Sequence, residues 1–208
     1  MRNKFFGDSF YSLFSRILPI FVLQYVLHPL IADKLSGDQY GKLLTIVALI
    51  NLSGVTIGGV LNNSRLVLGK ELGSRLKKGD YNFLLIVGLF IQTLYIVAIF
   101  YEFETFNKLS AAILLIYSVF LILRGYISVE LRFKLIFSKL FVDSILLTLG
   151  YVAGYFLFLL YGHWELIYFL GGLFSCIYLI RNTTILNEPI ARSKSFNFIA
   201  FQSSSLLF

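Results

Sequence analysis

A stripe of small, amide and cationic residues interrupts an otherwise apolar stretch between Asp33 and Tyr81. Its members, spaced three or four residues apart, are Asn51, Gly54, Gly58, Asn62, Arg65 and Gly69. At 3.6 residues per turn they share one sector of a helix whose other faces are mostly Leu, Val and Ile. A guanidinium such as that of Arg65 can hold a pyrophosphate group through paired hydrogen bonds. The alternative is snorkelling, in which the side chain reaches the lipid headgroups.

Further polar side chains interrupt the first apolar segment. Arg16 lies almost two turns into it. A cation within lipid costs about 2.5–3.5 kcal/mol on insertion scales, so we expect Arg16 either to line a cavity or to reach back to the headgroups. Gln24 and His28, one turn apart, offer hydrogen bonds to hydroxyl groups of a bound molecule. The alternative for His28, which precedes Pro29, is a place at the outer interface.

Three other polar residues within apolar segments favour structural roles. Gln92 lies in mid-segment, where an unpaired amide is costly, and its position predicts an interhelical hydrogen bond, with substrate contact as the alternative. Arg124 lies near a predicted membrane boundary and is expected to snorkel. Asp143 follows Lys139 by four residues, which predicts an ion pair along one helix.

Glycine pairs at a spacing of four predict close helix packing. One pair is Gly54 and Gly58, and the other is Gly150 and Gly154. In membrane helices, small residues four apart let two backbones approach each other closely. These glycines therefore predict helix contacts rather than a binding site.

The elements that position these residues are transmembrane helices. A membrane core needs about 20 apolar helical residues. Segments of that length, or nearly so, lie near 10–32, 42–65, 83–100, 109–128, 140–160 and 165–181. The predicted fold is an all-α integral membrane protein, with a six-helix transmembrane bundle over residues 1–195. Residues 196–208 are apolar again but too few to span, so they are either an incomplete seventh helix or an interfacial tail.

Composition supports the membrane class. Hydrophobic residues make up 58% of the 208, and charged residues only 14%, where a soluble domain carries about a quarter. Cys176, the only cysteine, lies within an apolar run, so no disulfide can form within the chain. The net charge of +7 comes from cations that gather at both ends and in alternate loops. The positive-inside rule then places both termini in the cytoplasm.

Several function classes find no support in the sequence. It carries no P-loop, H-E-x-x-H or G-x-S-x-G motif, so we expect no enzyme and no cofactor. Its two histidines, His28 and His163, offer no metal site. No basic face interleaved with aromatic residues is present, so nucleic acid is not an expected partner. The lipid bilayer is the expected surrounding.

Three short patterns carry a family resemblance. They are ADKLSGDQYG between the first two predicted helices, NNSRLVLGKEL at the end of the second, and KKGDY at the start of the third. Together they resemble the Wzx-type oligosaccharide flippases, which move O-antigen or capsule repeat units and belong to the multidrug/oligosaccharidyl-lipid/polysaccharide exporter group. The resemblance is best over residues 10–90. It implies two six-helix lobes around a central cavity, of which this chain matches the first lobe and the beginning of the second.

The resemblance implies a transport function. Its expected substrate is an undecaprenyl-pyrophosphate-linked oligosaccharide, moved from the cytoplasmic to the outer leaflet of the bacterial inner membrane. The residues expected to line the cavity are Arg65, Asn62, Asn51, Arg16 and Gln24. Because the chain matches only one lobe, it could be a truncated transporter, or two copies could form a homodimer in which the second copy replaces the missing lobe. The alternative is a non-transporting membrane subunit that scaffolds a polysaccharide polymerase or a glycosyltransferase.

Overall fold

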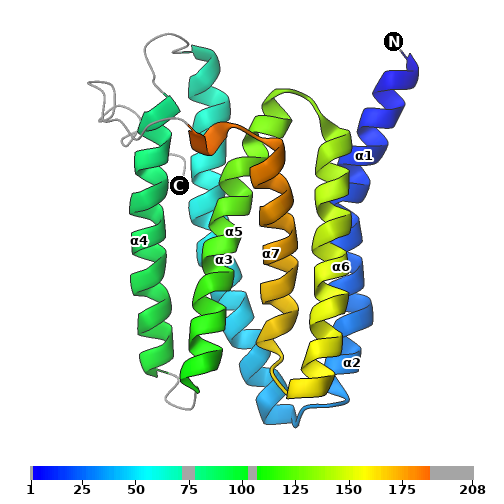
Figure 1. Cartoon of the computed structure of the whole chain (residues 1–208), viewed down its shortest axis with the longest axis vertical. Coiled ribbons are helices and arrows are strands. Elements are labelled where there is room, and N and C mark those ends of the chain that lie inside the picture. The colour runs from blue at the N-terminus through cyan, green and yellow to red at the C-terminus, as the bar shows by residue number, and fades with distance from the viewer. Residues whose placement is uncertain (1, 72–77, 103–106, 188–208) are drawn as a thin grey trace.

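All regular elements of the described chain are helices, which confirms the predicted all-α class. The computed structural model describes residues 2–71, 78–102 and 107–187 (Figure 1). The tail at 196–208, predicted to begin a further helix or to lie at the interface, is outside the described residues.

The first predicted segment is one continuous helical run with a widened turn. It consists of α1 (Arg2–Phe21), the π-helical turn η1 (Val22–Leu27) and α2 (His28–Ala32). Pro19 lies inside α1, close before η1. Proline lacks a backbone N–H and clashes with the carbonyl one turn earlier, so a change in the hydrogen-bonding pattern nearby is expected.

The remaining helices alternate in direction along the chain (Figure 1). They are α3 (Gly37–Glu71), α4 (Lys78–Glu102), α5 (Lys108–Phe133), α6 (Phe137–Tyr161) and α7 (Glu165–Asn182), followed by the short 3-10 turn η2 (Ile185–Asn187). As Figure 1 shows, the start of α1 and the end of α7 lie at the same end of the bundle.

Five segments of the described chain, rather than the predicted six, are long and apolar enough to cross a membrane. They are Phe6–Ala32, Gly37–Leu61, Tyr81–Glu102, Lys108–Phe133 and Phe137–Tyr161. The chain is therefore a multi-pass membrane protein. The remaining helix, α7, has 18 residues and carries Glu165 in its first turn and Arg181 in its last. At a rise of 1.5 Å per residue it is about 27 Å long, slightly less than the hydrocarbon core of a typical bilayer.

The tightest helix contact is that of α6 with α7, and Gly150 and Gly154 lie in it. A Cβ on Gly150 would be 2.5 Å from the carbonyl oxygen of Leu170 and 2.7 Å from the Cα of Gly171. A Cβ on Gly154 would meet the backbone of Ile167. Backbone atoms cannot rotate away, so these positions exclude any larger side chain.

The other predicted glycine pair lies where α3 crosses α5. A Cβ on Gly54 would be 3.2 Å from Cβ of Leu121. A Cβ on Gly58 would be no closer than 3.6 Å to its nearest neighbour, the carbonyl oxygen of Ile122. The crossing of α3 and α5 is therefore looser than the contact between α6 and α7.

This difference yields a stability prediction. Gly150→Ala forces α6 and α7 apart, and overpacking of this kind costs roughly 1–3 kcal/mol. We expect a lower thermal unfolding midpoint in detergent, followed by the fluorescence of Trp164. Gly58→Ala is the matched control, because its methyl group meets only ordinary van der Waals distances. Equal midpoints for the two variants would contradict the close approach of α6 and α7.

Candidate functional site

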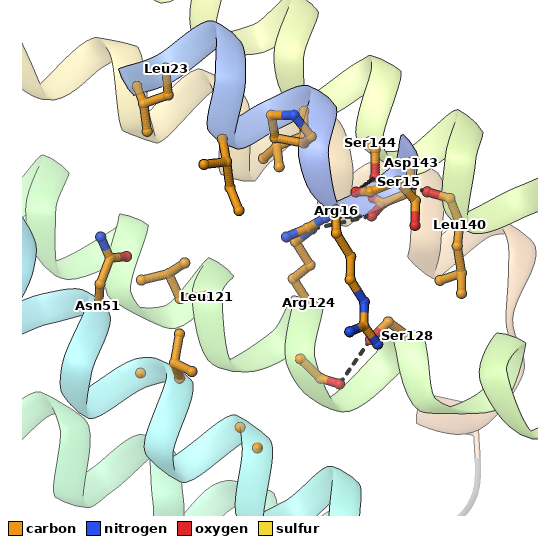
Figure 2. Close-up of a pocket in the computed structure, with 18 of the residues that line it drawn as sticks. Ser15, Arg16, Leu23, Asn51, Leu121, Arg124, Ser128, Leu140, Asp143 and Ser144 are labelled. Carbon is orange, nitrogen blue, oxygen red and sulfur yellow. Dashed lines mark hydrogen bonds and ion pairs between the residues drawn. The ribbon is translucent and has the colours of Figure 1, made fainter. Parts of the chain in front are cut away.

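A cavity of about 590 Å³ lies among α1, α3, α5 and α6. Helix α1 packs chiefly on α6, and α3 packs chiefly on α5, so the space between α1 and α3 is left open. The facing sides of α5 and α6 form the floor of this cavity (Figure 2). Of the residues that the sequence predicts for a cavity, Arg16, Gln24 and Asn51 line it.

The lining residues separate by charge along the bundle axis. We refer to the part of the cavity formed by Arg16, Arg124, Arg132 and Asp143 as the arginine end. We refer to the part formed by Gln24, Asn51, Tyr117 and Tyr151 as the amide–tyrosine end. The order follows from helix direction, because α1 and α6 run from the arginine end while α3 and α5 run towards it. The arginine end is thus the end of the bundle where α1 begins.

A buried ion pair organises the arginine end. Nε and Nη2 of Arg124 donate to Oδ2 of Asp143 at 3.2 and 3.0 Å, and the hydroxyl of Ser175 donates to Oδ1. The Asp143 side chain is only 2% exposed. The predicted pair of Asp143 with Lys139 was wrong, as was the snorkelling of Arg124. Asp143 faces the interior between α5 and α7, where the guanidinium meets it from the neighbouring helix.

The two other arginines are not neutralised by a carboxylate of the described chain. Arg16 is exposed, and Figure 2 shows its side chain extending from α1 into the cavity towards Ser128 of α5. Arg132, in the last turn of α5, is exposed and lies within electrostatic range of both Arg16 and Arg124. Among the described residues that line the cavity, three arginines are therefore accompanied by a single aspartate. A positive cleft with low-dielectric walls attracts anions.

The amide–tyrosine end carries no charged side chain among its lining residues. The hydroxyl of Tyr117 donates to Oδ1 of Asn51 at 2.9 Å, which leaves the amide nitrogen of Asn51 available. Gln24, in the π-helical turn η1, is exposed and also lines this end. This end therefore offers hydrogen bonds and ring faces without charge.

A buried aromatic layer lies beyond the amide–tyrosine end. Tyr168, which is fully buried, has its ring centroid 5.5 Å from that of Tyr117 and 6.3 Å from that of Tyr151. Nε2 of His28 lies 2.9 Å from the Tyr168 hydroxyl. His28 thus joins α2 to α7 and does not line the cavity.

Arg65 lies elsewhere, although it belongs to the same sequence stripe as Asn51. Its guanidinium donates to the Tyr126 hydroxyl at 2.9 Å and stacks on the rings of Tyr81 and Tyr126. The stripe diverges because α3 crosses α5 at Gly58. Beyond this crossing, Arg65 contacts Tyr81 of α4 and Tyr126 of α5. The side chain of Asn62 lies outside the part of the chain that the structure describes.

Within the described part of the chain, the predicted interhelical hydrogen bond of Gln92 is absent. Its side chain is fully buried in α4, and neither amide atom has a hydrogen-bond partner in the described chain. The neighbouring turns on the same face carry Gly88, which packs on Ile57, and the buried Ile96. These residues offer no side-chain donor or acceptor. Gln92 does not line the cavity either.

Comparison with models of known protein families, with curated proteins and with solved structures finds no match. Function is therefore inferred from the cavity and its residues. Sequence reasoning missed Arg132, Tyr117 and Tyr151 as lining residues and assigned Arg124 to the membrane surface. The sequence did indicate an interior position for Arg124 and Asp143, because both lie within apolar segments, and charged residues there usually face a partner or a cavity.

The ion pair generates a stability prediction. Asp143→Asn leaves the guanidinium of Arg124 without a counter-charge, and breaking a buried pair in this way costs roughly 3–5 kcal/mol. We expect a large fall in the thermal unfolding midpoint in detergent. The double variant Asp143→Asn with Arg124→Gln removes both charges and should recover most of the loss.

An exposed ion pair supplies the control. Asp38 pairs with Lys42 at 3.0 Å, and its side chain is 77% exposed. Asp38→Asn should change the midpoint little, because exposed pairs contribute about 0–1 kcal/mol. If Asp143→Asn were as mild as Asp38→Asn, the ion pair with Arg124 would not hold the bundle together.

Proposed function

We propose that this chain forms one lobe of a bacterial inner-membrane transporter that flips an undecaprenyl-pyrophosphate-linked oligosaccharide. The observation that carries the proposal is the pair of arginines, Arg16 and Arg132, exposed in a cavity within a membrane bundle. Ionisable groups in membrane segments are costly, and where they face a cavity they commonly mark the path of a substrate or ion. A planar guanidinium binds phosphate oxygens with two parallel hydrogen bonds.

The charge balance favours a diphosphate as the ligand. Arg124 is compensated by Asp143, so Arg16 and Arg132 provide the excess positive charge. Two guanidinium groups on opposite walls, one on α1 and one on α5, can each hold one phosphate of a diphosphate. A free cation at the same place would be repelled.

The open side between α1 and α3 supports a lipid-linked substrate. In this proposal the diphosphate enters the cavity while the polyprenyl tail stays in the bilayer. An arginine-bearing cavity cannot face hydrocarbon, so a second lobe or a second copy of this chain covers the open side. Two lobes related by an axis along the membrane normal would form the parallel-repeat arrangement of known transporters, and rocking of one lobe against the other would give alternating access.

Orientation follows from the basic residues. The arginine end lies where α1 begins and α7 ends, and the positive-inside rule assigns this end to the cytoplasm. The substrate head would then enter at the arginine end and leave past the amide–tyrosine end. A bound polysaccharide polymerase or glycosyltransferase is compatible with this arrangement but is not needed for it.

A binding measurement tests the phosphate contacts. The full chain in lipid nanodiscs is titrated with farnesyl diphosphate, a short polyprenyl diphosphate without sugar, by isothermal calorimetry. A hydrogen bond to a charged group contributes about 1.5–3 kcal/mol. Arg16→Gln and Arg132→Gln should therefore each weaken binding about tenfold or more. Raising the salt concentration should weaken binding of the unaltered chain.

Arg181→Gln is the matched control, because Arg181 is an exposed arginine of α7 that does not line the cavity. It should leave the affinity unchanged. Equal effects of all three substitutions, or no binding by the unaltered chain, would contradict the transport proposal. The second result would favour a scaffolding subunit instead.

A further inference from the structure

The turn between α5 and α6 has a leucine at a position where helices usually end in glycine. The amide of Ile136 donates to the carbonyl of Leu131 at 2.9 Å. The amide of Leu135 donates to the carbonyl of Arg132 at 3.1 Å. These two bonds form a Schellman motif, in which Leu135 takes the left-handed conformation with φ of 54°. Among the described residues other than glycine, Leu135 alone has a positive φ.

The side chain of Leu135 brings no gain within the chain that would offset this conformation. A left-handed backbone brings the Cβ of an L-residue close to the following carbonyl oxygen, and glycine avoids this cost. The same chain ends α6 in the usual way, with Gly162 at φ of 75°. Leu135 is 65% exposed and Phe133 is 55% exposed, so neither contributes much to the core. A strained and exposed apolar residue points to a contact outside the chain.

Helix length places this turn in the headgroup layer of a bilayer. Helix α5 has 26 residues and α6 has 25, so each is about 38 Å long at a rise of 1.5 Å per residue. The hydrocarbon core is about 30 Å thick, and the headgroups extend the bilayer to about 40–45 Å. When the excess of about 8 Å is shared between the two ends, the turn lies about 4 Å beyond the hydrocarbon. Exposed apolar side chains at this depth meet the boundary between headgroups and acyl chains.

Cations surround the two exposed apolar side chains. Arg132 and Lys134 flank Phe133 in the sequence, and the partly exposed Lys139 lies in the first turn of α6. Between residues 130 and 139 the only acidic residue is Glu130, which pairs with Lys134 at 2.5 Å. Three cations and one carboxylate leave this segment with a net charge of +2. Anionic lipids attract basic residues that lie at the depth of their phosphates.

We propose that the turn at residues 133–136, together with Lys139, is an anchor for anionic lipid. Leu135 and Phe133 insert at the boundary between headgroups and acyl chains, while Lys134 and Lys139 bind lipid phosphates. Leucine is retained at position 135 because glycine would relax the backbone but remove the inserted side chain. The anchor does not rest on the proposed function, since none of these four residues lines the cavity. It fixes the depth of the end of α5 that carries Arg132.

The depth of position 135 tests the insertion. Leu135→Cys is made in a Cys176→Ser background, so that a single thiol remains, and the full chain is labelled with a nitroxide. It is placed in nanodiscs of phosphatidylcholine and phosphatidylglycerol. Electron paramagnetic resonance then compares collisions with oxygen, which concentrates in the bilayer, and with a water-soluble nickel chelate. The references are Phe90→Cys in the same background, at a residue of α4 that is 64% exposed, and a lipid labelled on its headgroup.

We expect the ratio of oxygen to nickel collisions at position 135 to lie between the two references. A ratio at or below that of the headgroup label would leave the side chain in water, free for a soluble partner, and would overturn the anchor.

Lipid retention in native mass spectrometry separates the apolar from the charged contribution. Leu135→Asn tolerates the left-handed conformation but removes the apolar side chain, so it should reduce retention of phosphatidylglycerol and phosphatidylcholine alike, by several-fold. Lys139→Gln should reduce retention of phosphatidylglycerol about fivefold and leave phosphatidylcholine unchanged. The matched control is Lys34→Gln, because Lys34 is exposed at the opposite end of the bundle beside Asp33 (Figure 1). It should change neither.

The controls keep the result interpretable. Leu135→Asn relieves backbone strain, so it should not lower the thermal unfolding midpoint in detergent. A lower midpoint would show that the side chain supports the fold, and it would overturn the anchor. Equal effects of Lys139→Gln and Lys34→Gln on phosphatidylglycerol, or no effect of Leu135→Asn on either lipid, would overturn it as well.

Discussion

The contact of Arg124 with Asp143 is the constraint on which the rest of this bundle depends. It joins α5 to α6, and the hydroxyl of Ser175 extends it to α7. In a low-dielectric interior two opposite charges attract strongly, but only when both are placed well enough to offset their desolvation. The register of three helices is therefore tied to one pair of side chains.

The same pair sets the charge of the cavity. By compensating Arg124, Asp143 leaves the excess charge with Arg16 and Arg132 at the cavity wall and mouth. The next residue of α6, Ser144, faces α1, and its hydroxyl donates to the backbone carbonyl of Ser15. That bond holds α1 against α6 beside Arg16. Two adjacent residues of α6 thus have complementary roles: Asp143 compensates Arg124, and Ser144 holds α1 in place beside Arg16.

Much of the architecture could be predicted from sequence because apolar runs of transmembrane length are a local signal. Arg16, Gln24 and Asn51 could be assigned to a cavity for a similar reason, since each is polar within an apolar run. The partner of Asp143 could not, because the spacing to Lys139 is a local rule while Arg124 comes from another helix. Arg65 was misplaced because helical periodicity does not reveal where α3 crosses α5.

A structure of the full chain in a lipid phase with bound farnesyl diphosphate would test the central claim most directly. The account predicts diphosphate density in the cavity, within hydrogen-bonding distance of the guanidinium groups of Arg16 and Arg132, while Arg124 stays bound to Asp143. An empty cavity with Arg16 turned out to the lipid headgroups, and the diphosphate bound elsewhere, would contradict it.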